Sequence, residues 1–114
     1  MTRQPALVLQ QGEIWWVSLD PTQGSEIRKT RPAIVLTADA LNRVRRTVVV
    51  VPLSTGPEPR PPIVVATPSA GRGVVAVCDQ IRAVDKSRLT RRAGRVAAAD
   101  LHAVEHGLRT VLEL

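Results

Sequence analysis

The run Thr47–Leu53, TVVVVPL, constrains the fold of this chain more than any other segment. Its four consecutive valines are β-branched and favour a strand over a helix. A strand that lacks polar alternation is buried on both of its faces, so it belongs inside a sheet and not on a solvated surface. The fold must therefore supply neighbours for this strand from the rest of the chain.

Several other short segments have the composition of strands and are bounded by turn residues. We expect strands at Glu13–Leu19, Ala33–Thr37, Ile63–Ala66, Val74–Val77 and Gln80–Val84, with a last short one inside residues 85–95. The segment ADALNR favours a helical turn. Residues 54–62, STGPEPRPP, contain four prolines and no large apolar residue, which predicts a stiff loop.

The end of the chain changes to helical periodicity. Over Val96–Leu112, apolar side chains recur at spacings of three and four residues and mark one face of an amphipathic helix: Leu101, Val104, Leu108, Val111 and Leu112. Gly107 interrupts this pattern with a poor helix former. About six short strands followed by one helix predict a mainly β protein, a small closed or half-closed sheet with the helix packed against it.

Size and composition limit the class of protein. At 114 residues the chain forms one domain over 1–114, with residues 1–11 as a loose leader. The single cysteine excludes an internal disulfide, and no apolar run approaches the roughly 18 residues of a membrane span. Nothing at the amino terminus resembles a secretory signal. We therefore expect a cytoplasmic protein that makes no membrane contact.

The charge balance points toward a polyanion. There are 16 Lys and Arg against 10 Asp and Glu, a net charge of +6, and 14 of the 16 cations are Arg. Arginine presents a planar fork of donors that fits phosphate and can stack on bases. Nucleic acid is the favoured partner. A GC-rich genome, which favours arginine codons, is the alternative source of part of this bias.

Most familiar catalytic motifs are missing from the sequence. His102 and His106 are four residues apart, but the segment reads HAVEH, no third ligand is evident, and solvated histidines are the favoured interpretation. Cys78 has no neighbouring Cys or His and is interpreted as a buried structural thiol. No GxxxxGK loop is present, and the acidic residues are scattered singly. Phosphodiester chemistry would have to use Arg and hydroxyl groups, which the loops Asp20–Arg31 and Ser54–Arg60 supply.

Four segments, in a fixed order and followed by a helix, carry a family resemblance. GEIWWVSLDPTQGSE followed by RPAIVL, then VVVVPLST, then CDQIRAVDKSRLTRRAGRV and a terminal amphipathic helix resemble the MazF/PemK/Kid-like toxins of bacterial toxin–antitoxin modules. The resemblance covers residues 12–112. It implies a small SH3-like barrel with a C-terminal helix, which forms a homodimer with an RNA-binding groove.

The same resemblance implies an activity. Members of this family are sequence-specific endoribonucleases that cleave single-stranded RNA without a metal or other cofactor. They leave a 2′,3′-cyclic phosphate and a 5′-hydroxyl, and they arrest translation and growth until a cognate, MazE-like antitoxin blocks them. We expect the same function and the same partners for this cytoplasmic chain.

The resemblance also assigns roles to residues. The family's catalytic arginine before proline falls on Arg31, and its catalytic hydroxyl, usually Thr, falls on Ser54, with Thr55 open as the alternative. Glu26 matches a family glutamate linked to activity, as a candidate base or as a salt-bridge partner that orders the loop. Thr30 stands where some members carry His. The expected RNA-binding residues are Arg28, Lys29, Thr55, Arg60 and Gln80.

Two points are left open by the sequence. Trp15 and Trp16 are the only aromatic residues and, as neighbours in a strand, point to opposite faces. A core position is favoured for both, with exposure of one at a dimer or RNA surface as the alternative. Two other functions fit the fold: a non-catalytic toxin that acts on DNA gyrase, and a basic SH3-like module that binds RNA without cutting it.

Overall fold

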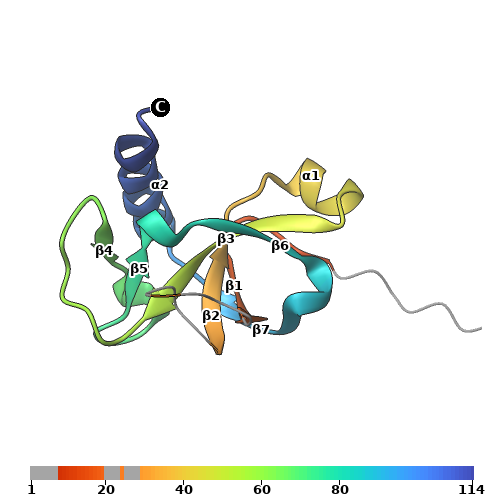
Figure 1. The fold of residues 1–114 in the computed structure, drawn as a ribbon, viewed down its shortest axis with the longest axis horizontal. Coiled ribbons are helices and arrows are strands. Elements are labelled where there is room, and N and C mark those ends of the chain that lie inside the picture. Colours follow the sequence, from red (N-terminus) through yellow and green to blue (C-terminus); the bar gives the residue numbers. More distant parts are fainter. Residues whose placement is uncertain (1–7, 20–23, 25–28) are drawn as a thin grey trace, which may run out of the picture.

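The computed structural model describes residues 8–19, 24 and 29–114. These residues form a curved antiparallel sheet with one long helix against it and a short helix at the other end (Figure 1). The long helix is α2 (Ala98–Leu112) and the short one is α1 (Asp39–Val44). The strands are β1 (Glu13–Ser18), β2 (Thr30–Val35), β3 (Thr47–Ser54), β4 (Val64–Ala66), β5 (Val75–Val77), β6 (Arg82–Asp85) and β7 (Leu89–Arg95).

Strand β3 holds the sheet together, as its composition predicts. The strand order is β4-β5-β3-β2-β1-β7, and β6 pairs with β3 in addition. The first half of β3 pairs with β6 and its last two residues pair with β5, while β2 pairs with its middle residues. Strands β4, β6 and β7 each have one neighbouring strand in the described sheet, so the sheet is not fully closed. The expected fold class, mainly β with a C-terminal helix, is confirmed.

The sheet buries apolar side chains on both faces, which explains the unbroken apolarity of β3. One cluster lies on one face of the sheet and includes Trp15, Val17 and Leu89. A second cluster joins the opposite face to α2 and includes Ile14, Leu53 and Val104. Because alternate residues of a strand point to opposite faces, β1 contributes Trp15 and Val17 to one cluster and Ile14 to the other.

A buried carboxylate ties β1 to the edge strand β7. Glu13 is 5% exposed, and its carboxylate accepts hydrogen bonds from Arg92 Nε at 2.6 Å, the Gln10 backbone N–H at 2.8 Å and Trp15 Nε1 at 3.1 Å. Burial by itself would raise the pKa of Glu13, but the bond from Arg92 and the two from Gln10 and Trp15 outweigh it, so the pKa lies below its usual value. The ionised carboxylate is thus part of the folded structure. Leu9, which falls within the predicted leader of residues 1–11, is buried in the core.

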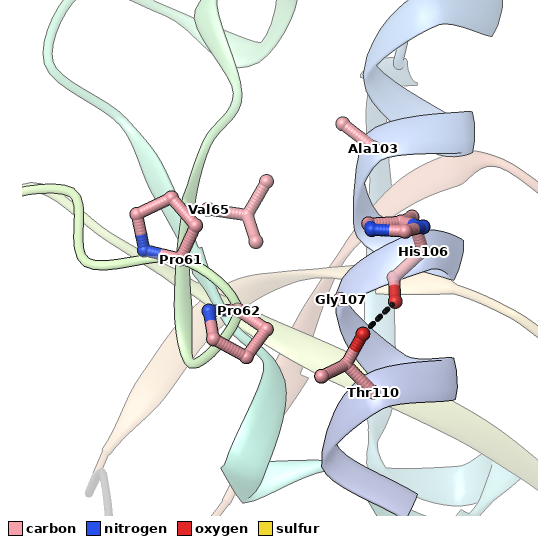
Figure 2. A pocket seen from close by; sticks show the side chains of 7 residues that line it. All are labelled: Pro61, Pro62, Val65, Ala103, His106, Gly107 and Thr110. Carbon is pink, nitrogen blue, oxygen red and sulfur yellow. Dashed lines mark hydrogen bonds between the residues drawn. The ribbon is translucent and has the colours of Figure 1, made fainter. Parts of the chain in front are cut away.

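Gly107 gives α2 its close contact with the sheet. A Cβ added at this position would lie 2.9 Å from the carbonyl oxygen of Pro62, 3.1 Å from Val65 Cγ2 and 3.3 Å from Cys78 Sγ. The glycine that interrupts the helical pattern is therefore a packing requirement. Beside this contact, an apolar cavity of about 420 Å³ separates Pro61, Pro62 and Val65 from the exposed turns of α2 (Figure 2).

Several element boundaries differ from the predicted ones by one to three residues. Strand β2 begins at Thr30 and contains Pro32, which is tolerated because β2 pairs only with β1 at that residue, and its pairing with β3 begins at Ala33. Residues Cys78–Gln80 form a 3₁₀ turn, so β6 begins two residues later than expected. Leu112, assigned to the apolar face of the helix, is 47% exposed. No helix in the described part of the chain is long and apolar enough to cross a bilayer.

Candidate active site

A small cavity opens on one side of the sheet, where β2 begins and β3 ends beside Trp16 of β1. Its volume is about 250 Å³, and it is lined by residues from these strands and from the turn before β5: Trp16, Thr30, Arg31, Pro32, Leu53, Ser54, Thr55 and Val74. The lining therefore combines one cation, three hydroxyl side chains and an indole ring above an apolar floor. Leu53 belongs to the core cluster under α2, so the floor is continuous with the core.

The pairing of β2 with β3 brings the predicted catalytic residues together. Ala33 is opposite Pro52 in this antiparallel pair. Two residues before Ala33 lies Arg31, and two residues after Pro52 lies Ser54, so the register carries both to the same end of the sheet. Arg31 is exposed and Ser54 is half-buried, and both line the cavity.

Ser54 is held in a defined local conformation. Its Oγ accepts a hydrogen bond from the backbone N–H of Gly56 at 3.4 Å. A hydroxyl that accepts from the backbone still has its own proton to donate. Thr55, which lines the same cavity, is exposed and belongs to the loop, whereas Ser54 is the last residue of β3. Of the two hydroxyls, that of Ser54 has the better-fixed position.

Trp16 joins the site, which corrects the expectation that both tryptophans lie in the core. Trp15 is 7% exposed and belongs to a core cluster, as expected. Trp16 points to the other face, is half-buried and lines the cavity. The guanidinium carbon of Arg91 lies 5.3 Å from the centroid of the Trp16 ring, a cation–π distance. The alternation of side chains in β1 predicted that the two rings point to opposite faces. Which of the two rings is accessible could be seen only in the folded structure.

The other predicted site residues lie in different places. Glu26 and Arg28 are outside the described residues. Lys29 precedes β2 with a backbone φ of +67°, and its carbonyl oxygen accepts from the Leu19 N–H at 3.0 Å. Arg60 is exposed and its backbone forms a bridge with Val64, and Gln80 ends the 3₁₀ turn. These last three do not line the cavity, and their RNA-binding roles stay predictions.

Cys78, His102 and His106, which were not assigned to a catalytic site from the sequence, lie away from the cavity. Cys78 is buried. Its burial, and to a smaller extent the nearby negative charge of Asp79, raise its pKa to about 11, so the thiol is protonated at neutral pH. His102 and His106 are exposed on α2. Among the described residues, no three His, Cys, Asp or Glu side chains form a group that could hold a metal ion.

Fold and site together define a class of small, mainly β protein with an exposed arginine and a hydroxyl side chain at one end of its sheet. The chain belongs to the family of PemK-like, MazF-like toxins of type II toxin–antitoxin systems, whose sequence pattern it matches over residues 3–112. It is 40% identical to the endoribonuclease PemK of Escherichia coli over 109 residues, which cover 91% of this chain and 82% of that protein. It is 34% identical to the endoribonuclease MazF9 of Mycobacterium tuberculosis over 116 residues, which cover 94% of this chain and 98% of that one.

Solved structures show the same fold. MazF of Deinococcus radiodurans superimposes with a TM-score of 0.84 at 27% identity and covers 95% of this chain and 99% of its own. A MazE–MazF structure from the same organism gives a TM-score of 0.77 at 26% identity and the same coverage. The recognition made from the sequence is therefore confirmed: the chain is a MazF/PemK-type toxin.

Proposed function

We propose that this toxin is an endoribonuclease that cleaves single-stranded RNA at the cavity between β1, β2 and β3. The observation that carries the proposal is the convergence of Arg31 and Ser54, distant in the sequence, on one cavity of about 250 Å³. Both residue types suit a phosphodiester, because guanidinium and hydroxyl groups donate hydrogen bonds to phosphate oxygens. The relatives named endoribonucleases, at 40% and 34% identity, support the same reaction.

In the proposed reaction, the RNA 2′-oxygen attacks the adjacent phosphorus. A bond forms between the 2′-oxygen and phosphorus, the bond from phosphorus to the 5′-oxygen breaks, and a 2′,3′-cyclic phosphate and a 5′-hydroxyl result. The 2′-hydroxyl gives up its proton to a base, and the leaving 5′-oxygen takes up a proton. Negative charge grows on the non-bridging oxygens meanwhile, so fixed donors aimed at them stabilise the transition state more than the ground state.

Arg31 fits the role of an electrostatic clamp on the phosphate and a proton donor to the leaving oxygen. A protonated guanidinium has no free lone pair to accept a proton, so it does not serve as the general base. The Ser54 hydroxyl, which keeps its proton while its oxygen accepts from Gly56, can donate to the same non-bridging oxygens. Glu26 is the proposed base, with a salt bridge that orders its loop as the competing role.

The partners follow from charge and from the family. A net charge of +6 on so small a protein attracts RNA, and the surface that attracts RNA also attracts an acidic antitoxin segment. A MazE–MazF complex is among the similar structures. We include a cognate MazE-like antitoxin and a homodimer in the proposal. Sedimentation of the toxin, alone and with its antitoxin, tests both.

The activity is tested by incubating the protein with a long single-stranded RNA in EDTA and mapping the fragment ends. Arg31→Ala is compared with Arg109→Ala, which removes the same charge from an exposed position on α2. We expect cuts at one short motif with 5′-hydroxyl ends from the wild type and Arg109→Ala, and a loss of about 100-fold or more in Arg31→Ala. RNA left intact by a folded, dimeric wild type would overturn the proposal and favour a non-catalytic toxin.

A further inference from the structure

The indole ring of Trp16 lies between the candidate catalytic cavity and an exposed arginine. In β1, Trp16 is opposite Pro32 of β2 on one side and Arg91 of β7 on the other. Directly opposite residues of antiparallel strands share a face, so the three side chains form a row across the sheet. Pro32 and Trp16 line the cavity that also contains Arg31 and Ser54, and Arg91 lies beyond it.

An irregularity in β7 produces this row. The pairing of β1 with β7 shifts between Trp16 and Val17, since Arg91 is opposite Trp16 but Leu89 is opposite Val17. Thr90 is thus an extra residue in the edge strand, and its Oγ1 donates to the carbonyl oxygen of Trp16 at 3.3 Å. The bulge allows Leu89 to enter the core while Arg91 stays beside the indole ring.

The composition leaves Trp16 as the aromatic surface that a base can reach. The chain has no Phe or Tyr and two Trp. Trp15 is buried, and its ring nitrogen donates to Glu13 at 3.1 Å. Trp16 is half-buried, and Arg91 does not line the cavity, so the part of the ring that faces the cavity is uncovered by the guanidinium. Stacking on an aromatic ring is the usual way for a protein to hold an unpaired base.

We propose that Trp16 is the base-stacking residue for the nucleotide next to the cleaved bond, and that Arg91 is a positioning residue that holds its ring. This inference rests on the proposed function, because it places the base beside the phosphate that Arg31 and Ser54 bind. A stack at this position fixes the sugar whose 2′-oxygen must line up with phosphorus. Since every base has a π-face, the stack supplies affinity and alignment for any base, and base edges are read elsewhere.

The experiment pairs changes in the protein with changes in the RNA. The Arg31→Ala protein, which binds without rapid cleavage, is titrated with a set of oligonucleotides that span the mapped cut site. Each oligonucleotide carries one abasic nucleotide at a different position. The titrations are repeated with Trp16→Leu and with Trp16→Phe in the same background. Coupling between a missing ring and a missing base identifies the pair that touches.

We expect one abasic position beside the cut to weaken RNA binding by about tenfold in the Arg31→Ala protein, which keeps Trp16. The same abasic position should weaken binding less than twofold when Trp16→Leu is added. Trp16→Phe should restore most of the effect, which separates stacking from loss of fold. Equal losses at every abasic position in both proteins would overturn the inference. Absence of RNA cleavage by the wild type would instead refute the proposed function, so the two failures are distinguishable.

The fluorescence of Trp16 tests the role of Arg91. When Trp15→Phe is added to the Arg31→Ala protein, the only indole is that of Trp16, and its fluorescence reports stacking of a base when the intact oligonucleotide is added. We expect quenching in this protein and weaker quenching after a further Arg91→Ala change. The matched control is Arg72→Ala, an exposed arginine in the turn before β5. Quenching that is unaffected by Arg91→Ala would remove Arg91 from the inference.

Discussion

The backbone carbonyl of Pro62 lies so close to Gly107 that a Cβ on the glycine would be 2.9 Å from its oxygen. This contact joins the proline-rich loop to α2 at one edge of the apolar cavity in Figure 2. Real Cβ atoms do not approach an oxygen that closely, so a larger residue must move either the loop or the helix. Helix α2 is thus fitted to the sheet at a position where helical preference alone would favour alanine.

Gly107→Ala is therefore expected to destabilise the protein, although alanine is the better helix former. The added methyl gains about 1 kcal/mol in helix preference but causes overpacking that costs about 1–3 kcal/mol against Pro62, Val65 and Cys78. Denaturant unfolding measures the difference. Gly56→Ala is the control, since an added Cβ there has open space around it. A more stable Gly107→Ala protein would show that the helix moves freely.

Glu13→Gln should reduce stability and flatten its acid dependence. The folded-state pKa of Glu13 lies below its ordinary value of 4.5, so the ionised group stabilises the fold above that pH and the contribution is lost as the pH falls below it. The change should cost about 2 kcal/mol at pH 7, since a buried, charge-assisted bond to half-exposed Arg92 is weakened.

Urea unfolding from pH 3 to pH 7 tests this prediction. The control is Glu58→Gln, which makes the same chemical change at an exposed residue of the proline-rich loop. Parallel profiles for the wild type and Glu13→Gln would contradict the role given to the Glu13–Arg92 pair.

Cys78 should resist alkylation in the folded protein. Its pKa is raised to about 11, so only a small fraction is thiolate at pH 8. Its sulfur is also buried against α2, so the reagent has little access to it. We expect iodoacetamide to label the native protein at least tenfold more slowly than the urea-unfolded protein. Because the chain has a single cysteine, mass spectrometry gives the labelled fraction directly. Equal rates would place the thiol at the surface.

Ser54→Ala should lose about 100-fold in RNA cleavage, while Thr55→Ala should stay within a few-fold of the wild type. The reason is position: Ser54 ends β3 and is half-buried, whereas Thr55 is exposed in the loop. Ser54→Thr restores the hydroxyl and should keep most of the activity. Circular dichroism checks that each variant is folded. Loss of cleavage in Thr55→Ala alone would transfer the catalytic role to Thr55.

Much of the fold could be predicted from local patterns, because most strands correspond to apolar runs bounded by turn residues. Thr47–Leu53 was placed in the interior of the sheet, and β3 is indeed buried there. The start of β2 was predicted too late because proline usually ends a strand, and its tolerance at Pro32 depends on which neighbours are present. Gly107 was read as a defect because its tight neighbours come from a distant loop.

The site was less accessible to sequence reasoning. No local pattern places Arg31 beside Ser54; the register between β2 and β3 does so, and only the family resemblance identified the pair in advance. Trp16 and Arg91 were missed as a pair because a bulge at Thr90 sets their alignment. Bulges leave little trace in the sequence, whereas the alternation of Trp15 and Trp16 could be predicted from strand geometry alone.

The pairing of β3 along both edges has a consequence for how such a toxin can diversify. The amide protons of β3 should be among the last to exchange with deuterium, because its hydrogen bonds open only when β2, β5 and β6 separate from it. Ser54 is thus attached to the slowest-opening part of the molecule, directly before the loop of residues 55–62. Mutations in that loop beyond Gly56, whose N–H binds Ser54 Oγ, can accumulate without displacing the proposed catalytic hydroxyl. Under the proposed function, new RNA preferences are then open to selection while the chemistry is kept.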